Sequence, residues 1–272
     1  MKIGIIGHGN MGAAIADRLK AKYQVFVLDK DEEKTKGCVG LTVVKNLEEL
    51  ADLADTLILA VKPQDFGTVL SEIQMYNQLH LVISIAAGIS TSFIESKLGK
   101  RSVIRVMPNL PAKIGAGMIC IARGQYTTGI DLSFVQAVFN RLGHTLVIDE
   151  KLMDAATAVS GSGPGFLYEL LINIPRVDWD KFIREQFVPK LSHAGQQSGF
   201  SPEQAQLLAE TTAQGALSLL HEAKVPPAIL KVRVASKGGT TEAGLLVLQG
   251  KIENLELAVR AALKRSEELS RK

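Results

Sequence analysis

The chain carries a glycine-rich hexapeptide that is suited to binding the phosphates of a dinucleotide. It follows an apolar run at residues 2–6 and opens a stretch with helical spacing. Glycines in such a turn let backbone N–H groups approach a pyrophosphate, and the positive end of the helix dipole favours the anion. The histidine within it either contacts phosphate or faces solvent. The candidate cofactor-binding residues of this turn are Gly7, His8, Gly9, Asn10, Met11 and Gly12.

An acidic residue follows the second predicted strand, residues 24–28. Asp29 can accept hydrogen bonds from the ribose hydroxyls of an adenosine, and its charge would repel a 2′-phosphate. Lys30 beside it can attract such a phosphate. The sequence therefore leaves the choice between NAD and NADP open, and both are expected cofactors. Asn46 is a further candidate cofactor residue.

Two more candidate cofactor segments lie where predicted strands end. Ligands of open α/β sheets bind beyond the carboxyl ends of the strands. In the first segment, the backbone around Lys62 should face the cofactor, and the alternative is that Lys62 is a solvated loop lysine. The second segment should lie against the nicotinamide. The residues of the two segments are Ala60, Val61, Lys62 and Pro63, and Met107, Pro108 and Asn109.

The second half of the chain contains two segments rich in glycine and hydroxyl side chains. Residues 160–164, Ser-Gly-Ser-Gly-Pro, precede an apolar helix, and residues 238–241, Gly-Gly-Thr-Thr, open another. The free N–H groups at a helix start can bind a carboxylate. The alternatives are a helix-breaking turn packed beneath another helix for the first segment, and capping alone for the second.

Short apolar runs alternate with helical stretches over the first 150 residues. This alternation predicts a parallel sheet covered by helices on both faces. The predicted strands are residues 2–6, 24–28, 56–61, 80–85, 103–107, 116–122 and 144–148, and the predicted helices are 11–21, 47–54, 66–73, 91–98 and 132–142.

After residue 150 the strands give way to helices. Ser201 and Pro202 form a helix start signal, with serine as the N-cap. The fold class is thus α/β: a Rossmann-type doubly wound sheet at residues 1–150, followed by an all-α dimerisation and substrate domain at 151–272. The predicted helices of the second domain are residues 152–159, 165–172, 179–199, 202–223 and 241–272.

Composition excludes several other classes of protein. The 272 residues are 46% hydrophobic and 5% aromatic, and 31 basic against 28 acidic side chains give a net charge of +3 without basic blocks. Neither nucleic acid nor a membrane is an expected partner. Cys38 and Cys120 lack metal-ligand spacing, so no metal or disulfide is expected. With no signal or membrane segment at the N-terminus, a cytoplasmic protein is expected.

Four segments together resemble the pyrroline-5-carboxylate reductase family and span nearly the whole chain: residues 60–63, 105–109, 160–164 and 236–241. The resemblance implies NAD(P)H-dependent reduction of 1-pyrroline-5-carboxylate to L-proline, the last step of proline biosynthesis. It also implies an interlocked helical homodimer, often built into a ring of dimers.

The resemblance further implies roles for single residues. Backbone amides near Gly239, Thr240 and Thr241 would hold the substrate carboxylate, and the Thr241 hydroxyl, the candidate catalytic group, would lie near the ring nitrogen. The candidate substrate-binding residues are Ser162, Gly163, Val234, Gly238, Gly239, Thr240 and Thr241.

The chain departs from the family pattern in three places. Residues 173–186 look like extra sequence within a helix that the family keeps continuous, which leaves the local dimer packing open. Lys237 stands where proline is common, and Val232 where an acidic residue is frequent. Neither of these two changes removes a backbone donor.

Two other functions stay open. One is a related imine reductase or β-hydroxyacid dehydrogenase, although the helix after Gly161 lacks the catalytic lysine of the hydroxyacid enzymes. The other is a nucleotide-binding paralogue without turnover.

Imine reduction needs no histidine base, because the cofactor carries the hydride. His193 and His221 are therefore expected to be surface or packing residues.

Overall fold

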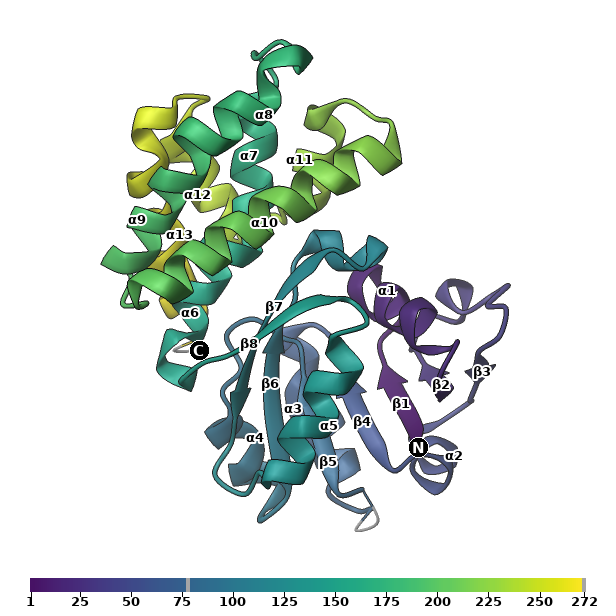
Figure 1. Ribbon diagram of the computed structural model, residues 1–272. Helices are drawn as coiled ribbons and strands as arrows, with labels where there is room; N and C mark the ends of the chain where they lie inside the picture. Colours follow the sequence, from purple (N-terminus) through teal and green to yellow (C-terminus); the bar gives the residue numbers. More distant parts are fainter. Residues whose placement is uncertain (77–78, 271–272) are drawn as a thin grey trace. The chain divides into compact units, whose positions relative to one another are not determined.

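The computed structural model describes residues 1–76 and 79–270, and the chain divides into two compact units (Figure 1). The sheet unit comprises Met1–Val106 and Ile121–Glu150, and the helical unit comprises Met107–Cys120 and Lys151–Lys272. The expected fold class, a Rossmann-type sheet followed by an all-helical domain, is confirmed. The division differs from a simple cut at residue 150 because Met107–Cys120 belongs to the helical unit.

The described residues of the chain form an eight-stranded sheet with the order β3-β2-β1-β4-β5-β6-β7-β8. Pairing is parallel from β3 through β6. Strand β3, only two residues long, was not predicted from sequence. The strands are β1 (Lys2–Ile6), β2 (Gln24–Leu28), β3 (Thr42–Val43), β4 (Thr56–Leu59), β5 (Leu81–Ser84), β6 (Ser102–Met107), β7 (Gly117–Arg123) and β8 (Gly143–Val147).

The strand order reverses beside β1, and this switch point positions the candidate cofactor residues. From β1 the chain builds β2 and β3 on one side, and it then returns to place β4 on the other side. Ile6 is in register with both Leu28 of β2 and Leu59 of β4. Gly7, Asp29 and Ala60 consequently leave the sheet side by side at its carboxyl edge, where open α/β sheets bind ligands.

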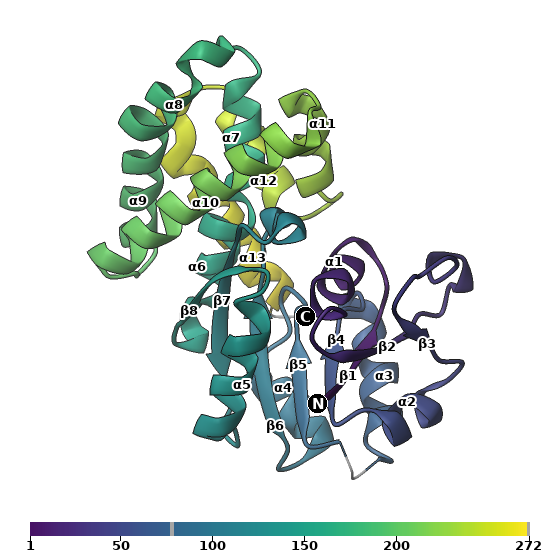
Figure 2. The same ribbon diagram turned by 45° about the vertical axis from the view of Figure 1, so that its right-hand side comes forward.

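Helices cover both faces of the sheet (Figures 1 and 2). Apolar side chains of α2, α3 and α4 form one core cluster with strand residues such as Leu57 and Val82. On the other face, Tyr23 beyond α1 packs edge-to-face on Phe134 of α5. The helices are α1 (Asn10–Leu19), α2 (Leu47–Leu53), α3 (Phe66–Ile73), α4 (Thr91–Leu98) and α5 (Gly129–Phe139).

The helical unit is built around α10, which begins where the sequence predicted. The Ser201 side chain accepts a hydrogen bond from the Gln204 N–H. The Gln204 side-chain oxygen accepts one from the Ser201 N–H, and the two bonds form a capping box. The helices are α6 (Met153–Ala156), α7 (Gly163–Leu171), α8 (Trp179–Phe182), α9 (Val188–Gln197), α10 (Pro202–Ala223), α11 (Pro227–Val234), α12 (Thr240–Leu248) and α13 (Leu255–Ser270).

The single helix predicted for residues 241–272 is wrong. Helix α12 ends at Leu248, where Gln249 adopts a left-handed conformation and Gly250 follows with a positive φ, and α13 begins at Leu255. A left-handed residue followed by glycine is a common way to end a helix. Residues 271 and 272 lie outside the described part of the chain. Helix α11 was also missed.

The extra segment at residues 173–186 contains the break between α7 and α8. Helix α7 ends at Leu171, a 3₁₀ turn spans Arg176–Asp178, and a π-helical turn at Ile183–Phe187 joins α8 to α9. Within the described residues, no helix combines the length and hydropathy needed to cross a lipid bilayer.

Candidate functional site

The three glycines of the turn after β1 have three different structural roles. Gly7 adopts a φ of +99°, and a Cβ there would lie 2.6 Å from the carbonyl oxygen of Ala60. A Cβ on Gly12 would lie 2.0 Å from the carbonyl oxygen of Gly7, so this glycine lets α1 pack against the strand end. A Cβ on Gly9 would meet none of the described atoms of the protein within 4 Å. Gly9 is therefore free to serve the approach of a ligand.

Helix α1 begins without a cap made by a side chain. Its N-cap is Gly9, no side chain of the described residues caps it with a hydrogen bond, and no acidic residue lies in its first turn. Helices α2, α4 and α5 of the same unit are instead capped by Asn46, Ser90 and Thr128. The exposed amides and the helix dipole make the start of α1 suitable for an anion. The turn therefore fits the pyrophosphate of a dinucleotide.

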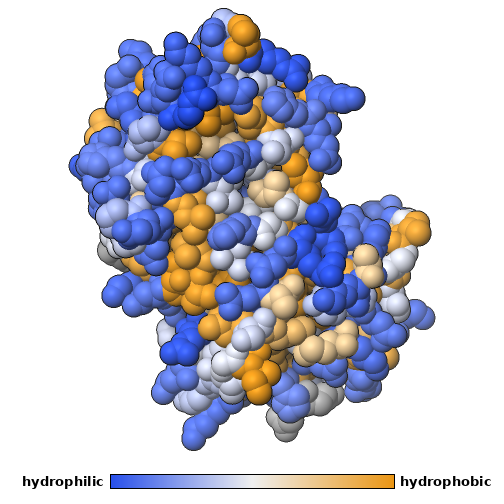
Figure 3. Space-filling view, viewed as in Figure 1, coloured by the Kyte–Doolittle hydropathy of each residue, from blue (hydrophilic) through white to orange (hydrophobic). Residues whose placement is uncertain are grey.

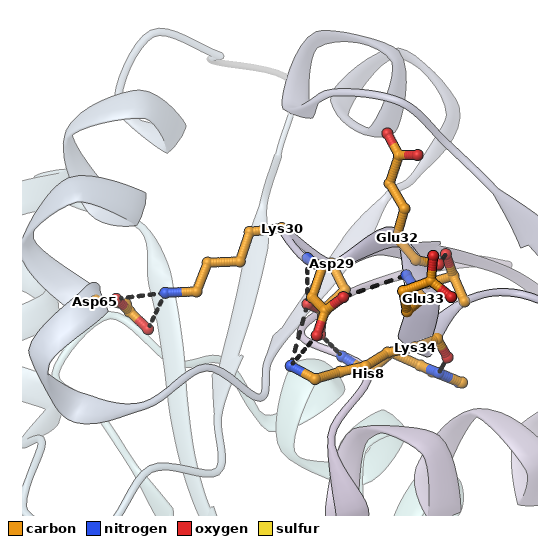
Figure 4. A network of polar contacts seen from close by, with 9 residues as sticks. His8, Asp29, Lys30, Glu32, Glu33, Lys34 and Asp65 are labelled. Carbon is orange, nitrogen blue, oxygen red and sulfur yellow. Dashed lines mark hydrogen bonds and ion pairs between the residues drawn. The ribbon is translucent and has the colours of Figure 1, made fainter.

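Asp29 lies at the centre of a polar network beside this turn (Figure 4). Its side chain is only 6% exposed. One carboxylate oxygen accepts the His8 backbone N–H at 2.6 Å, and the other accepts the Asp31 N–H at 2.9 Å and lies 3.5 Å from Lys34 Nζ. Burial acts to raise the pKa of Asp29, but these bonds and the nearby ammonium outweigh it and leave the pKa below its usual value. The carboxylate is charged at neutral pH and has lone pairs left for a ribose diol.

The His8 side chain contacts the loop after β2. Its Nδ1 lies 2.8 Å from the Lys34 carbonyl oxygen, and both ring nitrogens lie 3.9 Å from the Cys38 thiol. Since the His8 N–H also binds Asp29, this residue ties the glycine turn to the loop that follows β2. Its predicted contact with phosphate stays a prediction.

The loop after β4 borders the same edge of the sheet. Ala60 leaves the sheet beside Gly7, and its N–H donates to the Ile6 carbonyl. Val61 is partly buried, whereas Lys62 and Pro63 are exposed. This arrangement brings the predicted segment 60–63 next to the glycine turn, while the role of the Lys62 ammonium remains a prediction.

Met107, Pro108 and Asn109 are buried within the helical unit. Asn109 donates from Nδ2 to the Ser160 carbonyl at 3.2 Å and accepts the Met118 N–H at 2.9 Å. The side chain thus joins the segment 107–120 to the π-helical turn Thr157–Gly161. These bonds give Asn109 a structural role that the sequence did not predict, and its contact with a nicotinamide stays a prediction.

In the helical unit, three hydroxyls from two distant segments form a chain. The Thr241 hydroxyl donates to Ser162 Oγ at 3.1 Å, and Ser162 Oγ lies 3.1 Å from the Thr240 hydroxyl. Ser162 is fully buried and Thr241 is 5% exposed. The segments 160–164 and 238–241, predicted separately, are therefore brought together here.

Two glycines of α7 allow this close approach. A Cβ on Gly165 would lie 2.6 Å from a methyl carbon of Thr241 and 3.3 Å from Val234, and a Cβ on Gly163 would lie 2.8 Å from Thr212. The predicted substrate residues Val234 and Thr241 consequently pack on one face of α7. Gly165 was not among the predicted site residues, although the composition of the segment 160–165 was a signal for it.

The loop before α12 uses some of its amides internally. The Gly238 N–H donates to the Glu242 carboxylate at 2.7 Å, and the Gly239 N–H donates to the Ser236 carbonyl at 2.9 Å. Helix α12 has a glycine N-cap and no capping side chain. The amides of Thr240 and Thr241 remain as the predicted donors to a carboxylate.

Arg265 of α13 holds this loop from outside, since its Nε donates to the Gly238 carbonyl at 2.8 Å. Gly238 has a φ of +70°, so a larger residue there would be strained. Sequence reasoning missed Arg265 and Glu242, because both act through the loop and neither belongs to a recognisable motif.

A glycine turn at the switch point of a doubly wound sheet, followed in the chain by a helical unit with a candidate anion site, defines a two-domain dinucleotide-dependent oxidoreductase. Residues 2–88 match the family model for NADP oxidoreductase coenzyme F420-dependent, and residues 185–269 match that for pyrroline-5-carboxylate reductase dimerisation. The chain belongs to the pyrroline-5-carboxylate reductase family, as the resemblance implied.

Individual relatives match almost end to end. The chain is 35% identical to the pyrroline-5-carboxylate reductase of Aquifex aeolicus, over 92% of this chain and 90% of that protein. It is 34% identical to that of Synechocystis sp., over 100% of this chain and 99% of that protein. The crystal structure of Plasmodium falciparum pyrroline carboxylate reductase with NADP bound has a TM-score of 0.65 and 29% identity, over 99% of this chain and 98% of that one.

Proposed function

We propose that this protein is a pyrroline-5-carboxylate reductase that reduces 1-pyrroline-5-carboxylate to L-proline with NADH or NADPH. The hydroxyl chain of Thr241, Ser162 and Thr240 at the start of α12 carries the proposal. It combines an anion-binding helix start with a protic group, and a cyclic imino acid needs both. The relatives named above support the same reaction.

The reaction requires the protein mainly to position the imino acid against the nicotinamide. When bound, a reduced nicotinamide would supply the hydride for the imine carbon, and the imine nitrogen takes up one proton as it becomes the ring amine of proline. The amides of Thr240 and Thr241 hold the substrate carboxylate, and the Thr241 hydroxyl faces the ring nitrogen. Ser162 accepts the hydrogen of Thr241 before substrate binds and thereby fixes the rotamer of Thr241.

Steady-state oxidation of NADH and of NADPH with 1-pyrroline-5-carboxylate tests the proposal. We expect turnover with proline as the product. Dinucleotide binding without turnover of any cyclic imino acid would instead favour the non-catalytic paralogue. Rapid oxidation of a 3-hydroxy acid without imine reduction would favour the hydroxyacid dehydrogenase.

Glu242 provides a sharper test of the carboxylate site. Its carboxylate lies in the first turn of α12 and binds the Gly238 N–H, so it repels a second carboxylate at the same helix start. Glu242→Gln keeps an oxygen that can accept this N–H and removes the charge. We expect KM for the imino acid to fall about two- to fivefold with kcat unchanged.

Glu210→Gln, on α10, is the matched control because it makes the same change of charge outside the loop. It should leave KM unaltered. An unchanged or raised KM for Glu242→Gln would mean that the substrate carboxylate does not experience the Glu242 charge, and it would contradict the assigned position of the substrate carboxylate.

We also propose that the helical unit forms a homodimer, which can assemble further into a ring of dimers. The dimerisation family match supports this, as do apolar side chains at its surface, among them Val232, Leu246 and Leu257. Figure 3 shows hydrophobic residues at the surface among hydrophilic ones. A mass equal to one chain, measured by light scattering, would contradict the dimer.

We further propose that the protein is cytoplasmic. The free thiols of Cys38 and Cys120 support this location.

A further inference from the structure

The network around Asp29 bears on which dinucleotide the sheet unit binds. Asp29 lies at the end of β2, where dinucleotide-binding sheets place the residue that meets the adenosine ribose. From sequence, its charge opposes a 2′-phosphate and Lys30 favours one. The side-chain positions resolve this conflict (Figure 4).

Lys30 is turned toward a different carboxylate. Its Nζ lies 3.1 Å from both oxygens of Asp65, which sits in the 3₁₀ turn Pro63–Asp65 after β4. The Lys30 side chain is 77% exposed and that of Asp65 30% exposed, so the energy of the pair itself is small. The effect on the site is nevertheless clear, because a carboxylate beside the ammonium cancels most of its field at a third group.

The other lysines of the loop are paired as well. Lys34 lies 3.5 Å from Asp29 and 3.7 Å from Asp31, and Lys36 contacts Glu33. The segment 29–36 carries four carboxylates against three lysines, before Asp65 is added. The loop that would surround a 2′-phosphate is thus net negative, with a buried, ionised carboxylate at the ribose position.

We propose that this protein selects NADH over NADPH, with Asp29 binding the ribose diol and Asp65 neutralising Lys30. The inference rests on the proposed function only in that a nicotinamide dinucleotide binds the sheet unit. One like-charge contact at partly screened distances corresponds to about a tenfold difference in affinity. NADH should therefore bind at least about tenfold more tightly than NADPH.

The test measures binding of NADH and NADPH to the full chain by fluorescence, without imine substrate. Asp65→Asn frees Lys30 without touching the glycine turn and should lower the preference for NADH about two- to fivefold. Asp29→Ser should lower it by about tenfold. Asp17→Asn is the control: it disrupts the Asp17–Lys20 pair near the end of α1 and should leave the preference unchanged.

The dependence of the NADH preference on salt concentration shows whether charge or the shape of the site causes the preference. Because the discrimination is electrostatic, the preference for NADH should shrink as ionic strength rises. Equal affinity for the two dinucleotides, tighter binding of NADPH, or a preference unmoved by Asp65→Asn and by salt would overturn the inference while leaving the proposed reductase intact. If neither dinucleotide binds, the proposed function fails as well.

Discussion

Replacing Thr241 by valine is expected to lower kcat for imine reduction about a hundredfold, the lower range for loss of a positioned proton-transfer group. Valine has nearly the shape of threonine, so its packing against Gly165 of α7 is retained. What is lost is the hydroxyl that donates to Ser162 Oγ at 3.1 Å. Because the proposed carboxylate site consists of backbone amides, which the substitution retains, KM should change little.

The control for this substitution is Thr212→Val. Thr212 is fully buried in the same unit, and its hydroxyl has no hydrogen-bond partner among the described residues. The same loss of a hydroxyl should leave kcat unchanged there. If Thr241→Val kept full kcat with an unaltered pH profile, the proton on the ring nitrogen would come from elsewhere, and the assigned role of Thr241 would be wrong.

The sequence was sufficient to predict the architecture because its signals were local. The apolar runs at residues 2–6 and 24–28 gave β1 and β2 with their observed bounds, and Ser201 followed by Pro202 gave the start of α10. Period-2 and period-3.6 patterns report burial on one or both faces, and burial is what the sheet and helices achieve.

The missed elements depend on tertiary contacts. Strand β3 has two exposed residues and exists only through pairing with β2. Nothing in the composition of the segment 107–120 shows that Asn109 bonds to Ser160, or that a Cβ on Gly215 of α10 would lie 2.1 Å from the Ala116 carbonyl oxygen. Such contacts draw the segment into the helical unit.

Motifs in the sequence point to the segments of the candidate site, whereas the contacts between these segments are seen only in the structure. Motifs pointed to the turn at Gly7, the acid Asp29 and a helix start at residues 238–241. The motifs did not show three polar contacts. Asp29 accepts the His8 N–H, Asp65 pairs with the Lys30 ammonium, and Glu242 accepts the Gly238 N–H. These are pairings between polar side chains and partners that are not fixed by local periodicity, and they decide the charge at each site.

Alanine at Gly9 and at Gly12 is expected to cause two different failures, and the contrast tests the cofactor turn. A Cβ on Gly12 would lie 2.0 Å from the Gly7 carbonyl oxygen, so α1 must move from the strand end. Such overpacking costs about 1–3 kcal/mol, and Gly12→Ala should lower the melting temperature of the free protein. Dinucleotide binding should weaken as a consequence of the displaced helix.

Gly9→Ala should leave the free protein as stable as the parent. Gly9 has an ordinary φ of −77° and its added Cβ would meet no protein atom within 4 Å. The methyl group instead projects at the N-cap of α1, where the proposed site brings the backbone close to the pyrophosphate. We expect dinucleotide affinity to fall about tenfold or more, the effect of a lost close contact with a charged group.

Thermal melts with and without NADH, together with direct titration, separate the two results. The melting temperature of the Gly9→Ala protein should match the parent without NADH and rise less than the parent when NADH is added, since ligand stabilisation follows affinity. Gly67→Ala, at a glycine of α3 whose added Cβ would meet no described atom within 4 Å, is the control: it should hold or raise the melting temperature, as alanine favours a helix, and leave NADH affinity unchanged. Unchanged NADH affinity in the Gly9→Ala protein would mean that the pyrophosphate does not approach α1 at Gly9, and the carboxyl edge of β1 would lose its role as the cofactor site.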